Sequence, residues 1–235
     1  MSSKDVELDG IGLVRIIKRR GSRTIRLTFD EKGDVRVSIP YWIPFSSGVA
    51  FAKERKEWII KHRPERGRLF ASGDKIGKAH HMTIEGSPVY TTVQVRLKGS
   101  EILVKHPSSK AANDPSVQAA AERGAKKALL KEGNRLLPQR LSILAEQHGF
   151  RFRSVTVKQL KTKWGSCNQN HEITLNYYLL QLPWNLIDYV LIHELVHTEH
   201  LNHSEAFWQR FEQALPGAKK IRKELRTYKT SVIAK

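Results

Sequence analysis

Short stretches of alternating apolar and polar residues dominate the first 108 residues, and this alternation is typical of half-buried β-strands. Residues 24–29 and 35–39 alternate on either side of a polar turn, which predicts a β-hairpin. The pattern then predicts a helix at residues 48–62 and strands at residues 82–85, 89–97 and 101–104. We therefore expect residues 1–108 to form an N-terminal, β-rich mixed α/β module.

Helical spacing becomes prominent after a polar linker near residues 107–115, so residues 115–235 are expected to form a second domain. Its predicted elements are a helix at residues 116–148, strands at 154–158 and 172–176, a helix starting at Pro183, and helices at 204–214 and 219–228. Pro138 is expected either to kink the first of these helices or to start another. The sequence shows no internal repeat, and the predicted class is α+β.

The composition indicates a folded protein of a reducing compartment with no membrane partner. Its 235 residues are 40% hydrophobic, which is enough for a buried core. No run approaches eighteen apolar residues and residues 1–7 lack the apolar stretch of a secretory signal, so no membrane partner is expected. The single cysteine, Cys167, excludes an internal disulfide and suits a reducing compartment, which predicts a cytoplasmic location.

The formal net charge of +18 predicts a surface that attracts polyanions at low salt. The lysines and arginines are scattered along the chain, with no repeated basic and aromatic pattern. Two interpretations remain open: a solvated basic surface, or proximity to nucleic acid or to a phosphate-bearing substrate.

The chemistry of the chain is concentrated in the sequence His-Glu-Leu-Val-His at residues 193–197. On a helix, residues four apart lie on one face, so His193 and His197 can both bind one metal ion. Glu194 lies beside them, where it can accept a proton from water at the metal. The preceding residues have the apolar spacing of a buried helix face, which favours a metal site over two histidines that merely pack in a core.

A catalytic zinc ion needs a third protein ligand and an open position for water. His200 shares the helical face but lies about 10 Å along the helix from His193, which is too far for bonds of about 2 Å. His203 can reach the metal if the chain leaves the helix first, and Asn202 is expected to cap a new helix with His203 in its first turn. His203 is therefore the predicted third ligand, with Glu205 and Glu212 as alternatives.

Two other kinds of hydrolase fit the sequence poorly. The spacing from His197 to His203 is that of metzincins, but His200 stands where these have glycine, and Met1 and Met82 are the only methionines for a methionine turn. Cys167 could act as a nucleophile, but nothing near it in sequence supplies a fixed base.

The chain resembles the YgjP-like metallopeptidase family, a gluzincin-type group related to SprT-like proteins. The segments that carry the resemblance are Lys163–Cys167, Ile173–Asn176, Ile187–Val190, His193–His197 and Asn202–Trp208, with weaker marks at Arg23–Arg26, Val37–Pro40 and Lys56–Ile59. The resemblance implies zinc bound by His193, His197 and His203, with Glu194 as the catalytic carboxylate. It also implies a compact zincin-like domain with a backing helix, a small antiparallel-edged sheet, an active-site helix and C-terminal helices.

Several residues near the predicted site are candidates for substrate binding. The strand at residues 172–176 is the expected free sheet edge, which could pair with an extended peptide. Hydrogen-bond donors or packing groups for the substrate are expected among Trp164, Asn176, Tyr177 and His200.

Three functions follow from these observations. The leading hypothesis is a zinc metallopeptidase that acts on polypeptides with Glu194 as general base. A second is a metal-dependent hydrolase of nucleoside triphosphates or another phosphate-bearing substrate, although the chain has no glycine-rich phosphate loop. A third is a nucleic-acid-binding protein with a structural zinc ion.

Overall fold

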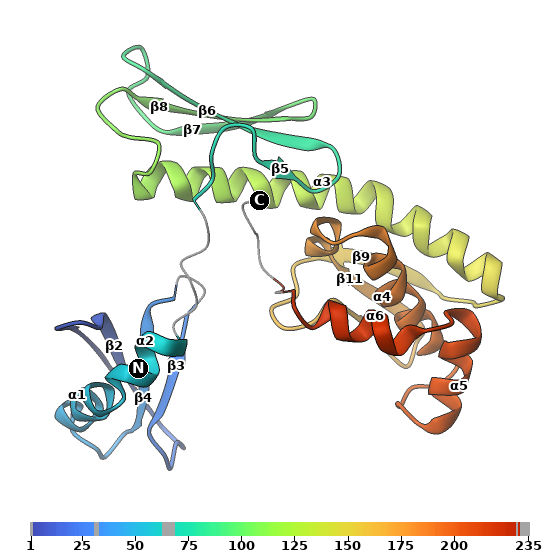
Figure 1. The fold of residues 1–235 in the computed structure, drawn as a ribbon, viewed down its shortest axis with the longest axis horizontal. Coiled ribbons are helices and arrows are strands. Elements are labelled where there is room, and N and C mark those ends of the chain that lie inside the picture. The colour runs from blue at the N-terminus through green and yellow to red at the C-terminus, as the bar shows by residue number, and fades with distance from the viewer. Residues whose placement is uncertain (1, 31–32, 63–68, 229, 231–235) are drawn as a thin grey trace. The chain divides into compact units, whose positions relative to one another are not determined.

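The computed structural model describes residues 2–30, 33–62, 69–228 and 230, and it confirms the predicted α+β class (Figure 1). The chain divides into two compact units, Met1–Arg68 and Leu69–Lys235. None of the described helices is long and apolar enough to cross a membrane.

The first unit is a four-stranded sheet with two short helices. Its strands are β1 (Ser3–Leu8), β2 (Gly12–Arg19), β3 (Arg26–Phe29) and β4 (Val35–Pro40), in the order β1-β2-β4-β3, and its helices are α1 (Phe45–Glu54) and α2 (Lys56–His62). The predicted hairpin is confirmed, because β3 and β4 pair antiparallel. The helix predicted at residues 48–62 is two helices separated at Arg55. Strand β1 was missed because most of its residues are exposed on both faces, so no alternation marks it.

A second sheet repeats the topology of the first. It contains β5 (Lys75–Ile76), β6 (His80–Ser87), β7 (Gln94–Lys98) and β8 (Glu101–Pro107), in the order β5-β6-β8-β7. In both sheets the two central strands are parallel and each outer strand is antiparallel to its neighbour. Each fourth strand also ends at a proline, Pro40 or Pro107, and a helix follows. This repeat lies in strand order and direction, and the sequence itself shows no internal repeat.

The long helix α3 (Pro115–His148) joins the second sheet to the remaining elements (Figure 1). Asp114 caps its start by accepting a hydrogen bond from the Ser116 backbone N–H at 2.8 Å, and Gly149 ends it with a left-handed φ of 74°. Pro138 lies inside this single helix. Gly124 lets the sheet approach closely, because a Cβ there would lie 2.6 Å from Ile102 Cγ2.

The division by contacts differs from the predicted domain boundary. The sheet β5–β8 packs on α3 and shares one core with it, from Ile76 to Ala218. Residues 69–107 therefore belong to the same compact unit as the helices that follow, and the division falls between Arg68 and Leu69. The polar stretch after residue 107 leads directly into α3.

The order of the remaining elements agrees with the expected backing helix, sheet, active-site helix and C-terminal helices. After α3 come β9 (Ser154–Lys158), β10 (Gly165–Cys167), β11 (Glu172–Asn176), the 3-10 helix η1 (Tyr177–Gln181), α4 (Trp184–Val196), α5 (Glu205–Ala214) and α6 (Ala218–Leu225). The small sheet has the order β10-β11-β9, with β10 antiparallel and β9 parallel to β11. The predicted free edge at residues 172–176 is therefore wrong: β11 is the central strand, and β10 and β9 are the edges.

Candidate metal centre

Helix α4, which carries His193, Glu194 and His197, is packed against other elements on almost all sides. Pro183 precedes its first turn, and Leu186, Leu191 and Leu195 are completely buried. Because the helix cannot rotate without exposing these side chains, its last turn presents His193, Glu194 and His197 in a fixed direction.

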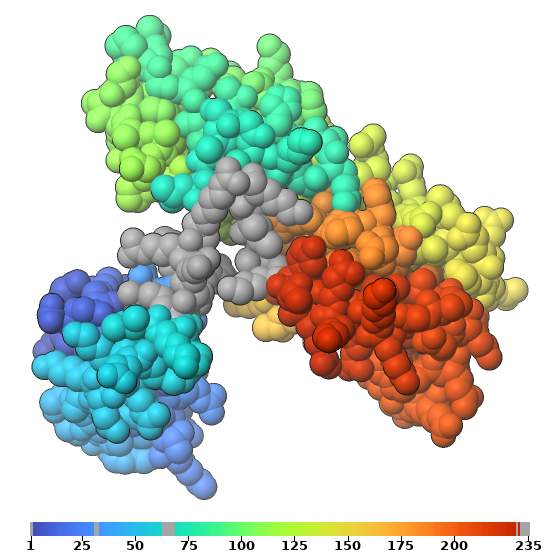
Figure 2. Space-filling model, viewed as in Figure 1, coloured from blue at the N-terminus to red at the C-terminus, as the bar shows by residue number. Residues whose placement is uncertain are grey.

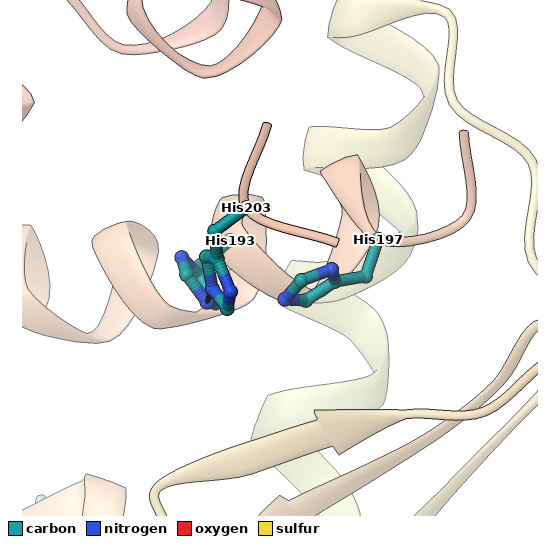
Figure 3. A group of neighbouring side chains, drawn as sticks. All are labelled: His193, His197 and His203. Atoms are coloured by element: carbon teal, nitrogen blue, oxygen red, sulfur yellow. Dashed lines mark hydrogen bonds between the residues drawn. The ribbon is translucent and has the colours of Figure 1, made fainter. Parts of the chain in front are cut away.

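The structure brings His193, His197 and His203 together, with one ring nitrogen from each lying within 4.8 Å of the others (Figure 3). The Nε2 atoms of His193 and His203 are 3.1 Å apart. His197 donates its Nδ1–H to the His200 carbonyl oxygen at 2.9 Å, which leaves Nε2 free for the metal. Figure 3 shows the rings of His193 and His203 overlapping in the view, with the His197 ring pointing toward them.

His203 reaches this position through a sharp turn after α4. The chain leaves the helix at His197, and α5 begins at Glu205 with Ser204 as its cap, which accepts a hydrogen bond from the Phe207 backbone N–H at 3.5 Å. The expected Asn202 cap is wrong, and His203 precedes the helix instead of lying in its first turn. The Phe207 ring packs under the cluster, with its centroid 4.7 Å from those of both His197 and His203.

The electrostatics of the cluster favour neutral imidazoles, which are the form that binds metals. Burial lowers the pKa of His193 to about 3, assisted by repulsion from His197, His203 and Arg222. Burial also lowers the pKa of His197, although its hydrogen bond to His200 opposes this shift. His193 Nδ1 is buried and has no hydrogen-bond partner among the described residues.

Glu194 lies against the edge strand of the small sheet. Its side chain is buried, and burial raises its pKa to about 8, while the charge of Lys163 acts in the opposite direction. A Cβ at Gly165 would lie 2.7 Å from Glu194 Cγ, so only glycine leaves room for the carboxylate. Strand β10 and the Glu194 side chain are therefore in direct contact.

These residues fit a divalent metal ion. Three converging neutral imidazoles are a common donor set for catalytic zinc, and nitrogens around a tetrahedral zinc lie about 3.4 Å apart, close to the His193–His203 spacing. The alternative ligands are engaged elsewhere: Glu205 accepts a hydrogen bond from Gln209 at 3.2 Å, and Glu212 accepts one from the Gly217 backbone at 2.7 Å.

Two of the expected substrate-binding residues have structural roles instead. Asn176 is completely buried and its amide donates hydrogen bonds to the carbonyl oxygens of Leu160 and Lys163, so it fixes the loop before β10. Tyr177 is also buried and donates its hydroxyl to Gln159. Both side chains are buried and use their polar groups inside the protein, Asn176 on backbone carbonyl oxygens and Tyr177 on the Gln159 side chain.

The other two candidates differ from each other. Trp164 lines the cleft beside the cluster, as expected. The His200 side chain does not line the cleft, and its contribution is the backbone carbonyl that orients His197.

The cleft beside the histidines has a volume of about 730 Å³ and is walled by β10, α4 and the C-terminal residues around α6. Its lining also includes Tyr189, which lies in the motif Ile187–Val190 without an expected role, and Arg222 and Arg226, which no local motif marks. Burial, with repulsion from Glu194, raises the pKa of Cys167 to about 11. This thiol therefore stays protonated at neutral pH, which argues against a nucleophilic cysteine.

The sequence of this chain matches the family described as "YgjP-like, metallopeptidase domain" over residues 23–228. The chain belongs to this family. The resemblance drawn from the motifs is thus confirmed, and so is the metallopeptidase function, with polypeptides as the substrate class and a catalytic metal implied. Nothing in the family match supports a phosphate-bearing substrate or a nucleic-acid partner.

Parts of this YgjP-like chain are similar to solved structures of two metallopeptidase zymogens. Abylysin of Pyrococcus abyssi is 28% identical, with a TM-score of 0.37, over 42% of this chain and all of that one. Jannalysin of Methanocaldococcus jannaschii is 17% identical, with a TM-score of 0.35, over 39% of this chain and 94% of that one. No curated protein matches the chain.

Proposed function

We propose that this YgjP-like metallopeptidase is a zinc enzyme in which His193, His197 and His203 hold the ion and Glu194 is the general base. The observation that carries the proposal is the convergence of three ring nitrogens within 4.8 Å beside a buried glutamate of the same helix. When bound there, zinc supplies Lewis-acid chemistry, which acidifies water and polarises the scissile carbonyl.

Glu194 performs the proton transfers. Its carboxylate accepts a proton from the attacking water and returns it to the nitrogen of the leaving amine. Burial suits both steps, because a carboxylate held out of water is a stronger base than an exposed one and can still release the proton. The contact with Gly165 fixes the carboxylate between α4 and β10.

Strand β10 is the proposed support for the substrate backbone. It is one of the two edge strands of its sheet, and all three of its residues line the cleft. An extended peptide can therefore add to this edge by backbone hydrogen bonds, which hold a polypeptide without requiring a particular side chain.

Metal content and peptide cleavage, measured together, test this proposal. Zinc-loaded protein is expected to cleave an unfolded polypeptide, and His193→Ala, His197→Ala and His203→Ala are each expected to lose both zinc and activity. Glu194→Gln should keep zinc and lose activity. His200→Ala is the matched control, because alanine retains the backbone carbonyl that binds His197. Full zinc binding by His203→Ala would overturn the ligand assignment.

A further inference from the structure

Two arginines of the C-terminal segment line the wall of the cleft opposite the small sheet. Arg222 lies in α6 and Arg226 ends that helix, so the two are one helical turn apart. Both line the cleft together with His193 and Tyr189. Figure 2 shows the α6 region, in red, at the surface of its unit, where a substrate can approach it.

No described acidic side chain forms an ion pair with either arginine. The Arg222 guanidinium lies instead over the Trp208 ring, 5.0 Å from its centroid, which positions the group without neutralising it. The positive charge acts on neighbouring groups of the cleft. Burial is the main cause of the lowered pKa of His193, and Arg222 adds to it. Burial raises the pKa of Tyr189, and both arginines oppose that shift.

The cleft as a whole is cationic. Lys163, Arg222 and Arg226 line it, and among the described residues of its lining Glu194 is the only acidic one. A bound divalent ion would add positive charge on the same side. Among the described residues, Arg140 is paired with Asp188 at 2.6 Å and Arg210 with Glu199 at 2.7 Å, whereas Arg222 and Arg226 have no such partner. The unpaired arginines therefore leave binding capacity for an anion from outside the protein.

On this basis we propose that Arg222 and Arg226 recognise a carboxylate of the substrate, so that the enzyme prefers peptides with a carboxylate close to the scissile bond. This inference rests on the peptidase function proposed above. A guanidinium matches a carboxylate through two parallel N–H···O hydrogen bonds, and a peptide carries carboxylates only on aspartate, on glutamate and at its C-terminus. The shared chemistry is thus a carboxylate, from a side chain or from the chain end.

Binding to the zinc-loaded Glu194→Gln protein tests the proposal without cleavage. Three fluorescent peptides of one sequence are compared by anisotropy: glutamate near the centre with an amidated end, glutamine there with an amidated end, and glutamine there with a free C-terminus. We expect a carboxylate peptide to bind about 10-fold or more tightly than the amidated glutamine peptide, with a difference that shrinks in high salt.

The three peptides distinguish the two sources. Tighter binding of the glutamate peptide assigns the site to a side chain, and tighter binding of the free C-terminus assigns it to the chain end. Equal binding of all three overturns the proposal. Absence of cleavage by the wild-type enzyme would instead count against the proposed function, since carboxylate preference is measured here on an inactive protein.

Charge-matched variants locate the effect. Arg222→Gln with Arg226→Gln should remove the preference, whereas Lys219→Gln with Lys220→Gln should retain it, because those lysines lie near the start of the same helix and do not line the cleft. Arg222→Lys keeps the charge but loses the two-pronged geometry, so an intermediate preference is expected. Equal loss in both double variants would show that only net charge matters, and would overturn the assignment.

Discussion

Two buried glutamates in this protein have the same surroundings at first sight and opposite roles. Glu132 on α3 and Glu194 on α4 are 2% and 5% exposed. Each lies near a histidine and opposite a glycine: a Cβ at Gly77 would come within 2.5 Å of Glu132, and one at Gly165 within 2.7 Å of Glu194. Burial and composition alone do not separate them.

Hydrogen bonding separates them. Glu132 accepts the backbone N–H groups of Lys78, Ala79 and His80 at 2.7–3.1 Å and also contacts the His80 ring. It therefore fastens the β5–β6 turn to α3. Glu194 receives no hydrogen bond from a described residue and lines the cleft. A carboxylate whose bonds are all used inside the protein stabilises the fold, and one left without donors is available for chemistry.

The largest expected difference is in turnover. Glu194→Gln should reduce kcat by about 10²- to 10⁴-fold, because the amide cannot accept the proton, while metal content and thermal unfolding with zinc stay near wild type. Glu146→Gln, an exposed change on α3, is the control. If Glu194→Gln retained turnover, Glu194 would not be the general base, and its proposed difference in role from Glu132 would be wrong.

Removal of the Glu132 carboxylate is expected to reduce the stability of the fold and not the turnover per folded molecule. Glu132→Ala should lower the free energy of unfolding by about 3–5 kcal/mol, since several backbone N–H groups and His80 lose their acceptor in a buried place. Chemical denaturation measures this effect. Glu146→Ala should change the value by about 0.5 kcal/mol or less, and a similarly small change in Glu132→Ala would contradict the fastening role.

The metal-free protein should reveal the cost of burying Glu194. Because its pKa is raised in the fold, the folded state binds this proton more tightly, so the contribution of Glu194 to stability is fully present below pH 4.5 and is lost as pH rises toward about 8. Glu194→Gln should remove this fall and be more stable by up to about 4 kcal/mol at pH 8. Urea unfolding of metal-stripped protein at pH 5 and pH 8 tests this; parallel profiles for the two proteins would contradict it.

The two glycines give the smallest and most specific contrast. Gly165→Ala should reduce activity about 10-fold by displacing Glu194, with a stability change of about 1 kcal/mol, since its backbone is not left-handed. Gly77→Ala should cost about 1–3 kcal/mol of stability, because its φ of +67° strains alanine and its Cβ meets Glu132, while activity per folded molecule is kept. If both variants lose only stability, Gly165 does not position Glu194.

Local spacing explains what could be predicted from the sequence. The helix of His193 and His197, the β3–β4 hairpin and strands β9 and β11 are each specified by residues a few positions apart. His203 could also be predicted as a ligand, because only a short turn separates it from α4. The capping prediction at Asn202 failed because Ser204, two residues later, offers an equally good cap.

Contacts between distant segments explain what was missed. The partners of Glu132 lie more than 50 residues before it, and nothing near Glu132 in sequence marks them. Arg222 and Arg226 reach the cleft only through the packing of α6 against α4. Strand β10 is three residues long, too short for alternation to show, although it forms the edge that touches Glu194. The repeated sheet topology also could not be predicted from the sequence, because it is defined by the order and direction of strand pairing and not by any local pattern of residues.

The 34 residues of α3 have a consequence for how this protein can be divided. The β5–β8 sheet packs on α3 and seals part of its surface, and α3 also packs against α4, which carries the proposed metal ligands His193 and His197. A fragment beginning at residue 115 would expose that sealed face to water and is expected to aggregate, although it keeps every proposed metal ligand. The smallest portion expected to fold on its own begins near Leu69, so the β5–β8 sheet must accompany the site in any fragment made for study.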